Sequence, residues 1–311
     1  MADSNNDRRD SDSDFNAHAQ RPAGLLNREE YIEQAYFFRV YRERVEENVP
    51  SQEILEVVEQ EILATTRLPM AIDFLKGEIL LTGLLNPGMS RLNHYFTGFQ
   101  TFMVAKAEDD NSKLDYRVAL EILEREAEYR ADNPTMPGMF VFQFECIARN
   151  RLGYDAGMVA VAEDPIFDET WKKWIRWLRL QLGTRDLADF LYFHSQQYIE
   201  DQKRDPTKTA TDVKDTVALF GAKEGRIARA NRGRDPLYMF AALQRQLGYP
   251  TVPRSLRHEQ GPVIHPVLEQ RLNRIEKRLK LIETESKGGL DLSDFYETPP
   301  KFDDDPTSLN G

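Results

Sequence analysis

Apolar residues recur every third or fourth position along most of the chain, the spacing that places them on one face of an α-helix. No stretch alternates between apolar and polar residues strongly enough to build a sheet. The pattern therefore predicts an all-α protein whose helices form a layered or orthogonal bundle. Helices are expected over the following ranges: 27–48, 50–66, 68–85, 89–103, 114–130, 138–154, 168–182, 185–203, 236–247 and 266–285.

Residues at helix ends sharpen two of these predictions. Asp235 is placed to cap the start of 236–247, Pro236 suits the first helical position, and Gly248 can take the left-handed conformation that closes a helix. The range 138–154 is ambiguous, because its phenylalanines alternate as they would in a strand. It ends on the same Leu-Gly-Tyr sequence that follows 236–246, so we predict a helix there too.

The range 68–85 is the most apolar part of the chain, and we expect a helix buried on most sides. It carries Asp73, Lys76 and Glu78, which a membrane span would not tolerate without partners. The first residues of the sequence lack the apolar core of a secretory signal. These features predict a cytoplasmic protein that does not enter a membrane.

Composition divides the chain into parts that differ in polarity. Both ends are polar, so we expect them to be disordered. The predicted parts are a disordered tail over 1–24, a helical body over 25–203, a basic and glycine-rich connection with one helix and a proline-rich stretch over 204–262, a heptad helix over 263–286, and a disordered acidic tail over 287–311.

The range 266–285 carries a coiled-coil pattern, with apolar residues at alternating intervals of four and three. Glutamates occupy the e positions and arginines the g positions, so unlike charges meet when two copies pair in parallel. Antiparallel pairing sets like charges together. The residues assigned to self-association are Leu268, Leu272, Ile275, Leu279, Ile282, Arg271, Glu276, Arg278 and Glu283.

This pattern favours a parallel homo-oligomer. Because leucine occupies the a positions and isoleucine the d positions, a parallel trimer or tetramer is possible as well as a dimer. Two alternatives remain. The helix could lie on the body of its own chain, or it could pair with a helix of another protein. A pattern of only a few heptads is marginal for independent association.

A second candidate site is the basic stretch 220–236, in which arginines recur every third residue. Its cations are Lys223, Arg226, Arg229, Arg232 and Arg234. It lacks the glycine and Gly-Lys-Ser/Thr spacing of phosphate loops. Guanidinium groups could nevertheless hold a phosphate or a carboxylate. The alternative is a connection whose cations pair with surface acids of the same protein.

Charge argues against nucleic-acid partners, because the chain carries 52 acidic against 41 basic side chains and a formal net charge of −11. Trp171 and Trp174 share a side with leucines and are expected in the core, whereas Trp177 projects elsewhere and could mark a contact. The single cysteine, Cys146, excludes an intrachain disulfide and suggests an inert core residue. His194 suits a packed, hydrogen-bonded imidazole.

No metal-ligand spacing, nucleophile motif or acid/base pair is recognisable, so no cofactor, metal site or catalytic residue is assigned. The acidic tail interleaves three aromatic residues, Phe295, Tyr296 and Phe302, with carboxylates. Such a segment is typical of a docking motif, and the alternative is a solubilising tail.

Together these features favour a non-catalytic cytoplasmic interaction or assembly protein that self-associates through its heptad helix. The alternative is an enzyme or sensor that binds a small phosphorylated or anionic ligand at 223–234.

Overall fold

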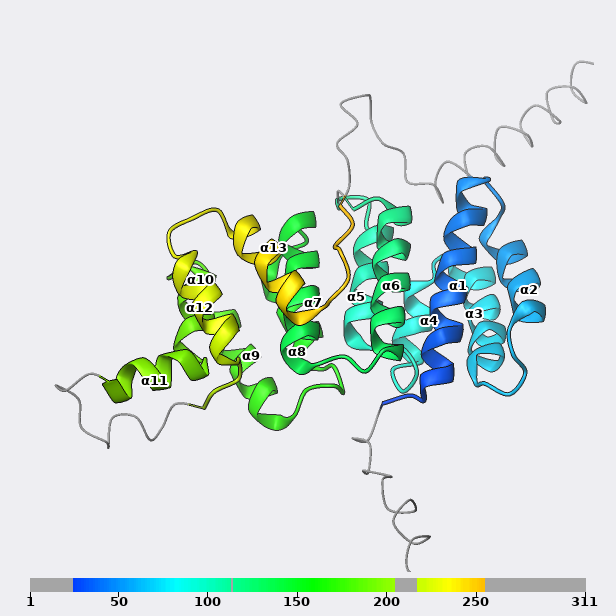
Figure 1. The fold of residues 1–311 in the computed structure, drawn as a ribbon. Helices are drawn as coiled ribbons and strands as arrows, with labels where there is room; N and C mark the ends of the chain where they lie inside the picture. Colours follow the sequence, from blue (N-terminus) through cyan, green and yellow to red (C-terminus); the bar gives the residue numbers. More distant parts are fainter. Residues whose placement is uncertain (1–24, 113, 205–216, 255–311) are drawn as a thin grey trace, which may run out of the picture. The chain divides into compact units, whose positions relative to one another are not determined.

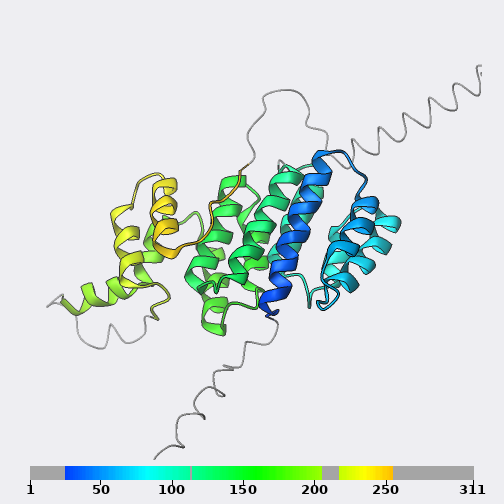
Figure 2. The ribbon, with the colours of Figure 1, turned by 45° about the vertical axis from the view of Figure 1, so that its right-hand side comes forward.

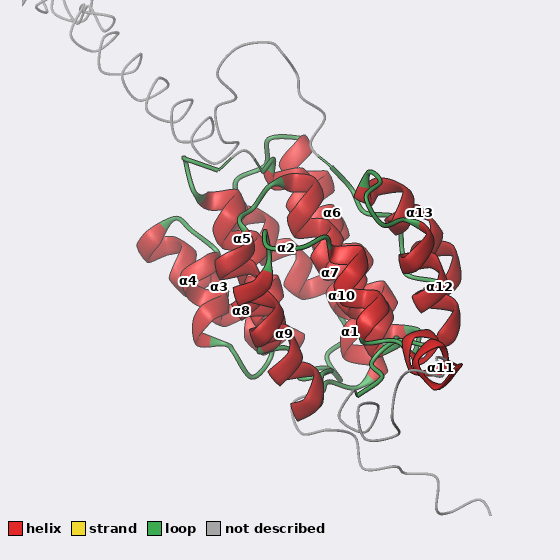
Figure 3. Cartoon of the chain, turned by 90° about the vertical axis from the view of Figure 1, so that its left-hand side faces the viewer, coloured by secondary structure: helices red, strands yellow, loops and turns green. Residues whose placement is uncertain are grey.

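The computed structural model describes residues 25–112, 114–204 and 217–254. They all belong to one compact unit within Met1–His265. These residues form thirteen α-helices and no β-strand, so the all-α prediction is confirmed (Figures 1 and 3). The helices are α1 (Arg28–Glu46), α2 (Ser51–Glu61), α3 (Leu68–Thr82), α4 (Asn86–Arg91), α5 (Gly98–Glu108), α6 (Tyr116–Ala131), α7 (Met136–Asn150), α8 (Tyr154–Ala162), α9 (Glu169–Gln181), α10 (Leu187–Phe193), α11 (Gln196–Arg204), α12 (Ala222–Ala230) and α13 (Pro236–Leu247).

The first half of the fold is arranged around α1, which packs along α6. The two helices are antiparallel, since Arg28 Nε near the start of α1 donates to the carbonyl of Ala131 at the end of α6, 3.1 Å away. Arg42 and Glu124 join them again at 3.0 Å. Helices α2 and α3 lie on the side of α1 away from α6 (Figures 1 and 2). Helix α3 packs mainly against α2 and α4 and makes fewer contacts with α1.

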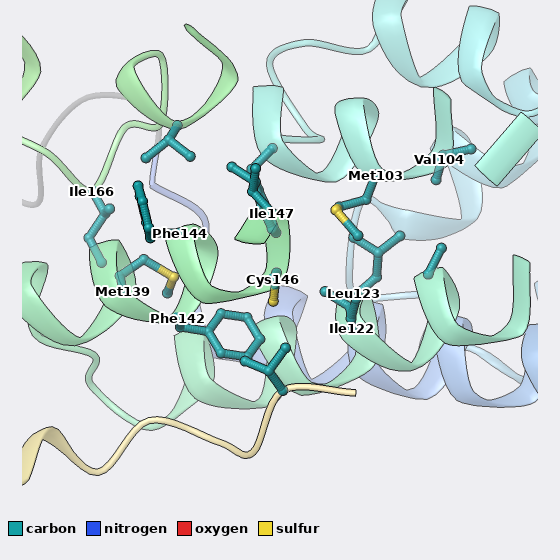
Figure 4. Packing of buried hydrophobic residues seen from close by; sticks show 14 of the residues in the cluster. Met103, Val104, Ile122, Leu123, Met139, Phe142, Phe144, Cys146, Ile147 and Ile166 are labelled. Atoms are coloured by element: carbon teal, nitrogen blue, oxygen red, sulfur yellow. The ribbon is translucent and has the colours of Figure 1, made fainter. Parts of the chain in front are cut away.

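The centre of the core is α7, which is buried along nearly its whole length. Figure 4 shows Phe142, Cys146 and Ile147 of α7 in one apolar cluster with Met103 of α5 and Leu123 of α6. Thr135 caps its amino end by accepting from the amide of Gly138 at 3.1 Å. The alternating phenylalanines thus sit on a helix that is buried all round, which confirms the helix predicted for 138–154.

Aromatic rings join α7 to the second half of the fold. Phe140 of α7 contacts Trp174 of α9 with ring centres 4.9 Å apart, and Trp171 contacts Phe220 at 5.2 Å. Residues 217–220 return to the junction of α10 and α11, where Gln196 N donates to Phe220 O at 2.9 Å and Leu219 N donates to His194 O at 2.8 Å. Helix α12 packs against α10 and α11 at this junction, and α13 packs against both α12 and α7.

Two predicted helices are each interrupted in the structure. The helix expected over 89–103 is divided into α4 and α5, because Thr97 and Gln100 form a capping box that starts a new helix at Gly98. The helix expected over 185–203 is divided into α10 and α11 at Ser195, next to the backbone bonds from 217–220. In both cases the apolar spacing continues across the break, so periodicity alone does not reveal it.

Helix α13 follows the sequence prediction at both ends. Asp235 accepts from Leu237 N at 2.9 Å, Pro236 is the first helical residue, and Gly248 closes the helix with a positive φ of 70°. Helices α8 and α12 were not predicted. The second of these lies inside the range expected to be a connection.

Candidate functional site

Helix α3 presents an uncovered apolar face. The side chains of Met70, Leu80 and Leu81 are 77%, 63% and 82% exposed, and Phe74 is 38% exposed. Met70, Phe74, Gly77 and Leu81 follow one another at intervals of four, three and four, which places them along one line of the helix. The expectation that this range is buried on most sides is therefore wrong.

The opposite face of α3 explains why the helix forms. Leu68, Ile72 and Leu75 are fully buried against the core, and Pro69 and Gly83 mark the two ends of the helix. Burial of one stripe is enough to fix an amphipathic helix. The described residues leave Met70, Leu80 and Leu81 on the other side largely exposed, so the burial of these three side chains is not what fixes the helix.

The flanks of this face are charged. Lys76 Nζ lies 2.5 Å from a carboxylate oxygen of Glu59 on α2 and 3.1 Å from Asp73. On α2, Val57 is 39% exposed. We use "α3 face" below for Met70, Phe74, Gly77, Leu80 and Leu81.

The basic stretch 220–236 is folded against α10 and α11. Arg229 pairs with Asp201 at 2.7 Å, and Arg232 pairs with Asp189 at 2.5 Å. The Arg232 guanidinium also lies over the ring of Tyr192, 4.5 Å from its centre. Two of the five assigned cations are thus engaged with neighbouring acids.

The other three assigned cations, Lys223, Arg226 and Arg234, are exposed and form no ion pair with the described residues. None of the five lines either of the two hollows described below. The structure thus brings two of these side chains together with carboxylates and leaves three in solvent. Binding of an anion there stays a prediction.

A pocket of about 330 Å³ lies beside this stretch, between α7, the start of α8, the turn from α9 to α10 and the start of α13. Its floor is aromatic: Phe144 and Tyr154 stack with ring centres 5.5 Å apart, and Phe240 lies 6.2 Å from Phe144. Burial raises the pKa of Tyr154. We call the cavity lined by these residues the α7–α13 pocket.

Charged side chains stand at the rim of the α7–α13 pocket. Arg149 and Arg185 line it together with Asp186 and Asp235. Asp186 accepts from Gly233 N at 2.9 Å, which ties the turn between α12 and α13 to the start of α10. No local sequence pattern indicates this pocket, because its walls come from segments that are distant in the chain.

A second, larger hollow of about 580 Å³ runs along α1 towards the end of α6. Some of its polar side chains are engaged in bonds that hold the fold together. Tyr36 donates to Glu61 at 3.0 Å, and Glu33 accepts from Leu63 N at 3.1 Å.

A charged cluster is buried between α6, α7 and residue 164. Arg130 pairs with Glu126 at 2.8 Å and with Asp164, and Gln143 donates to both carboxylates. Burial is the main reason that the pKa of Glu126 is raised, and the charge of Asp164 adds to it, whereas Arg130 opposes it. The four-residue spacing of Glu126 and Arg130 is visible in the sequence, but their burial is not.

The remaining side chains singled out in the sequence are packed. Trp171 and Trp174 are buried, whereas Trp177 is 42% exposed and contacts Phe190 and His194. His194 Nδ1 lies 3.0 Å from the carbonyl of Phe190, and burial lowers the pKa of the imidazole. Cys146 is buried, and burial raises the pKa of its thiol. The core predictions for Trp171, Trp174 and Cys146 are confirmed, and His194 is packed and hydrogen-bonded as expected.

The self-association residues in 268–283 and the tail aromatics at 295, 296 and 302 lie outside the described residues. Among the helices that the structure describes, none has the length and apolar character needed to cross a lipid bilayer. Within the same residues, no group of three or more His, Cys, Asp or Glu side chains is placed to hold a metal ion. No protein-family model, curated protein or solved structure matches this chain.

Proposed function

We propose that this chain is a non-catalytic cytoplasmic interaction protein that assembles with copies of itself. The observation that carries the proposal is the α3 face, an apolar surface that the described residues leave uncovered. A cytoplasmic location is consistent with a single, buried cysteine, because disulfides are rare in that compartment.

The size of the α3 face supports a protein partner. Exposed apolar residues scattered singly are ordinary on a protein surface, but contiguous ones mark interaction sites. Four large apolar side chains gather here within twelve residues of one helix, Met70 to Leu81. Burying a fully exposed side chain of this kind contributes about 1.5–3 kcal/mol. The four side chains are 38% to 82% exposed, so each can contribute a part of that amount, and together they can support association.

The arrangement of the α3 face favours a second copy as that partner. Gly77 stands in the middle of the face, and a Cβ atom added there would meet nothing within 4 Å. Two α3 helices that cross antiparallel at Gly77 can therefore approach closely. A two-fold axis at that point sets Phe74 of each copy near Leu80 of the other, a self-complementary contact of the kind found in symmetric dimers.

The heptad pattern of 268–282 supplies the second contact in this proposal. Two weak interfaces on one chain reinforce each other, because the first contact raises the local concentration of the second. The α3 face and the heptad segment would then act together, although each is modest alone.

The test is sedimentation velocity on the full-length chain across a range of concentrations. We expect the wild-type protein to sediment as an oligomer, and Leu81→Glu to shift it towards monomer because a carboxylate cannot be buried unpaired in the interface. The matched control is Leu180→Glu on α9, where the leucine is 67% exposed but lies off the α3 face.

A second variant, Leu272→Lys with Leu279→Lys, tests the heptad segment in the same full-length chain. It should also favour the monomer. A wild-type protein that is monomeric at every concentration contradicts the proposal. An oligomer that neither variant weakens contradicts both contacts and leaves the assembly unexplained by them.

A further inference from the structure

We propose that the α7–α13 pocket binds a free aromatic amino acid. The ring of the ligand lies on the aromatic floor, and its α-ammonium and α-carboxylate groups meet the charged rim. The residues that line the pocket belong to one compact unit of the chain. The inference concerns a small molecule, so it does not depend on the α3 face or on assembly.

The floor of the pocket suits a flat ring. Phe144 and Tyr154 are stacked with an angle of 23° between their rings, and the ring centre of Phe240 lies 6.2 Å from that of Phe144. Phe144 and Phe240 are buried, whereas Tyr154 is 44% exposed, so part of its ring is open to a ligand. Aromatic rings attract one another in offset-stacked and edge-to-face arrangements beyond the effect of burial alone. The floor therefore favours an aromatic ligand over an aliphatic one.

The volume of the pocket suits a small molecule. About 330 Å³ lies at the lower end of the range for ligand sites, which begins at about 300 Å³. Leu187 and Pro236 extend the apolar wall beyond the aromatic rings. One or two fused rings with a short polar substituent match a pocket of this size and lining.

The rim carries both signs of charge in equal number. Arg149 and Arg185 stand there with Asp186 and Asp235, so the rim does not select a ligand of either net charge. A zwitterion uses a cation and an anion of the protein at once, and it brings no net charge into the pocket. Burying an unpaired charge is costly, so a balanced rim favours such a ligand.

Each aspartate of the rim keeps one carboxylate oxygen for a ligand. Asp186 accepts from Gly233 N through Oδ2, and Asp235 accepts from Leu237 N through Oδ1, both at 2.9 Å. The second oxygen of each has no hydrogen-bond partner among the described residues. A carboxylate can accept several hydrogen bonds, and an ammonium group supplies three donors. The backbone bonds also fix both carboxylates before a ligand arrives, which lowers the entropic cost of binding.

Arg185 is the cation that remains for the carboxylate of the ligand. It is exposed and forms no ion pair with the described residues, whereas Arg149 is already paired with Glu145. A guanidinium group binds a carboxylate through two parallel hydrogen bonds. Arg185 directly precedes Asp186 in the chain, so unlike charges come from neighbouring residues of the rim. The two charged groups of an amino acid are likewise separated by a single carbon atom.

Isothermal titration calorimetry of the full-length chain with four indoles tests the proposal. L-Tryptophan carries both charged groups, tryptamine lacks the carboxylate, indole-3-propionate lacks the ammonium group, and indole lacks both. We expect L-tryptophan to bind at least tenfold more tightly than tryptamine or indole-3-propionate, and indole to bind most weakly. L-Phenylalanine and L-tyrosine should also bind, whereas L-leucine, an aliphatic zwitterion, should not.

Two results of this titration overturn the proposal. One is the absence of binding by all three aromatic amino acids at millimolar concentration. The other is equal affinity for the four indoles, which would mean that the charged rim takes no part. N-acetyl-L-tryptophanamide has the same ring within an uncharged, peptide-like backbone and should bind at least tenfold more weakly. Affinity equal to that of L-tryptophan would assign the pocket to a side chain of a partner protein and contradict a free amino acid.

Arg185→Gln tests the contact with the carboxylate. It should weaken the binding of L-tryptophan at least tenfold and leave the affinity for tryptamine unchanged, because tryptamine has no carboxylate. The matched control is Arg176→Gln on α9, an exposed arginine outside the pocket, which should change neither affinity. Equal losses for both ligands in Arg185→Gln would contradict the role assigned to this side chain.

Tyr154→Leu tests the floor, since it replaces an aromatic wall by an aliphatic one at a half-exposed position. It should weaken L-tryptophan and tryptamine by the same factor, at least fivefold. Unchanged affinity would place the ring elsewhere and overturn the proposal. Leu81→Glu on the α3 face should bind L-tryptophan as the wild type does, so loss of assembly and loss of ligand binding are distinguishable.

Discussion

Arg130 and Asp164 form an ion pair in which the arginine side chain is 1% exposed and the aspartate side chain is fully buried. The same guanidinium also binds Glu126 one helical turn away, so one cation serves two buried carboxylates. Removing any one member of such a cluster destabilises the fold, because it leaves a buried charge that is neither hydrated nor paired.

We predict that Arg130→Met lowers the free energy of unfolding by about 3–5 kcal/mol, since it leaves two carboxylates buried without a counter-charge. Urea denaturation measures the change. The control is Lys172→Met, which removes an exposed pair with Glu169 at 3.4 Å and should cost less than about 1 kcal/mol. Equal effects of the two substitutions would contradict this account of the cluster.

Glu108 should make the stability of the protein depend on pH. It accepts from Leu85 N at 2.6 Å and from Asn86 N at 2.9 Å, yet burial raises its pKa from 4.5 to about 7. The folded state therefore holds this proton more tightly than the unfolded chain does. The stability that results is fully present below the unfolded pKa and is lost as the pH rises through about 7.

Glu108→Gln removes this titration. The unfolding free energy of the wild type should fall relative to that of Glu108→Gln as the pH is raised from about 5 to about 8, because only the wild type loses a proton that the folded state holds. Urea denaturation at a series of pH values measures it. Parallel curves for the two proteins would show that Glu108 titrates at the same pH in the folded and unfolded states.

Two glycines should respond in opposite directions to alanine. At Gly225 on α12, a Cβ atom would lie 2.1 Å from Ser195 Oγ and 2.8 Å from the Cβ of Gln197. Gly225→Ala should therefore force α12 away from the junction of α10 and α11 and cost about 1–3 kcal/mol.

Gly77 is the matched control, because it also lies within a helix but faces open space. Gly77→Ala should stabilise the fold by up to about 1 kcal/mol through its higher helix propensity. Thermal unfolding at low protein concentration compares the two. A loss of stability at both positions would mean that α3 is covered in the folded monomer.

The thiol of Cys146 should be unreactive in the native protein, because it is buried and burial raises its pKa. A thiol-specific chromogenic reagent should modify it at once in guanidinium chloride and at least a hundredfold more slowly in native buffer. A cysteine placed at the exposed position of Leu180 gives the native-state control. Comparable rates at the two sites would show that α7 opens readily.

The sequence allowed the fold class and the ends of single helices to be predicted. Asp235, Pro236 and Gly248 act within a few residues of one another, so their effect on α13 is local. Such signals need no knowledge of the rest of the molecule.

The expectations of a mostly buried helix over 68–85 and of an unbroken helix over 185–203 were wrong, and both errors have the same physical cause. Whether the α3 face is covered depends on which helices pack against α3, and the apolar sequence of 68–85 carries no information on that point. The break at Ser195 likewise arises from bonds to residues 219 and 220, more than twenty positions away.

Candidate sites depend still more on tertiary contacts. The arginine spacing of 220–236 left open whether its cations bind an anion or pair with acids of the same protein, and it did not identify Asp189 and Asp201 as the partners of two of them. The α7–α13 pocket unites Phe144 with Leu237, which are nearly a hundred positions apart. No local sequence pattern indicates that these two residues line the same pocket.

The backbone bonds between 217–220 and the junction of α10 and α11 have a practical consequence. Together with the packing of α12 on α10 and α11 and of α13 on α7, they hold the last two helices to the preceding ones by contacts that do not pass through residues 205–216. A chain divided within that segment should therefore remain a two-piece complex, and the two pieces produced separately should reassemble. The segment is accordingly a natural position for a reporter insertion or for a split version of the protein.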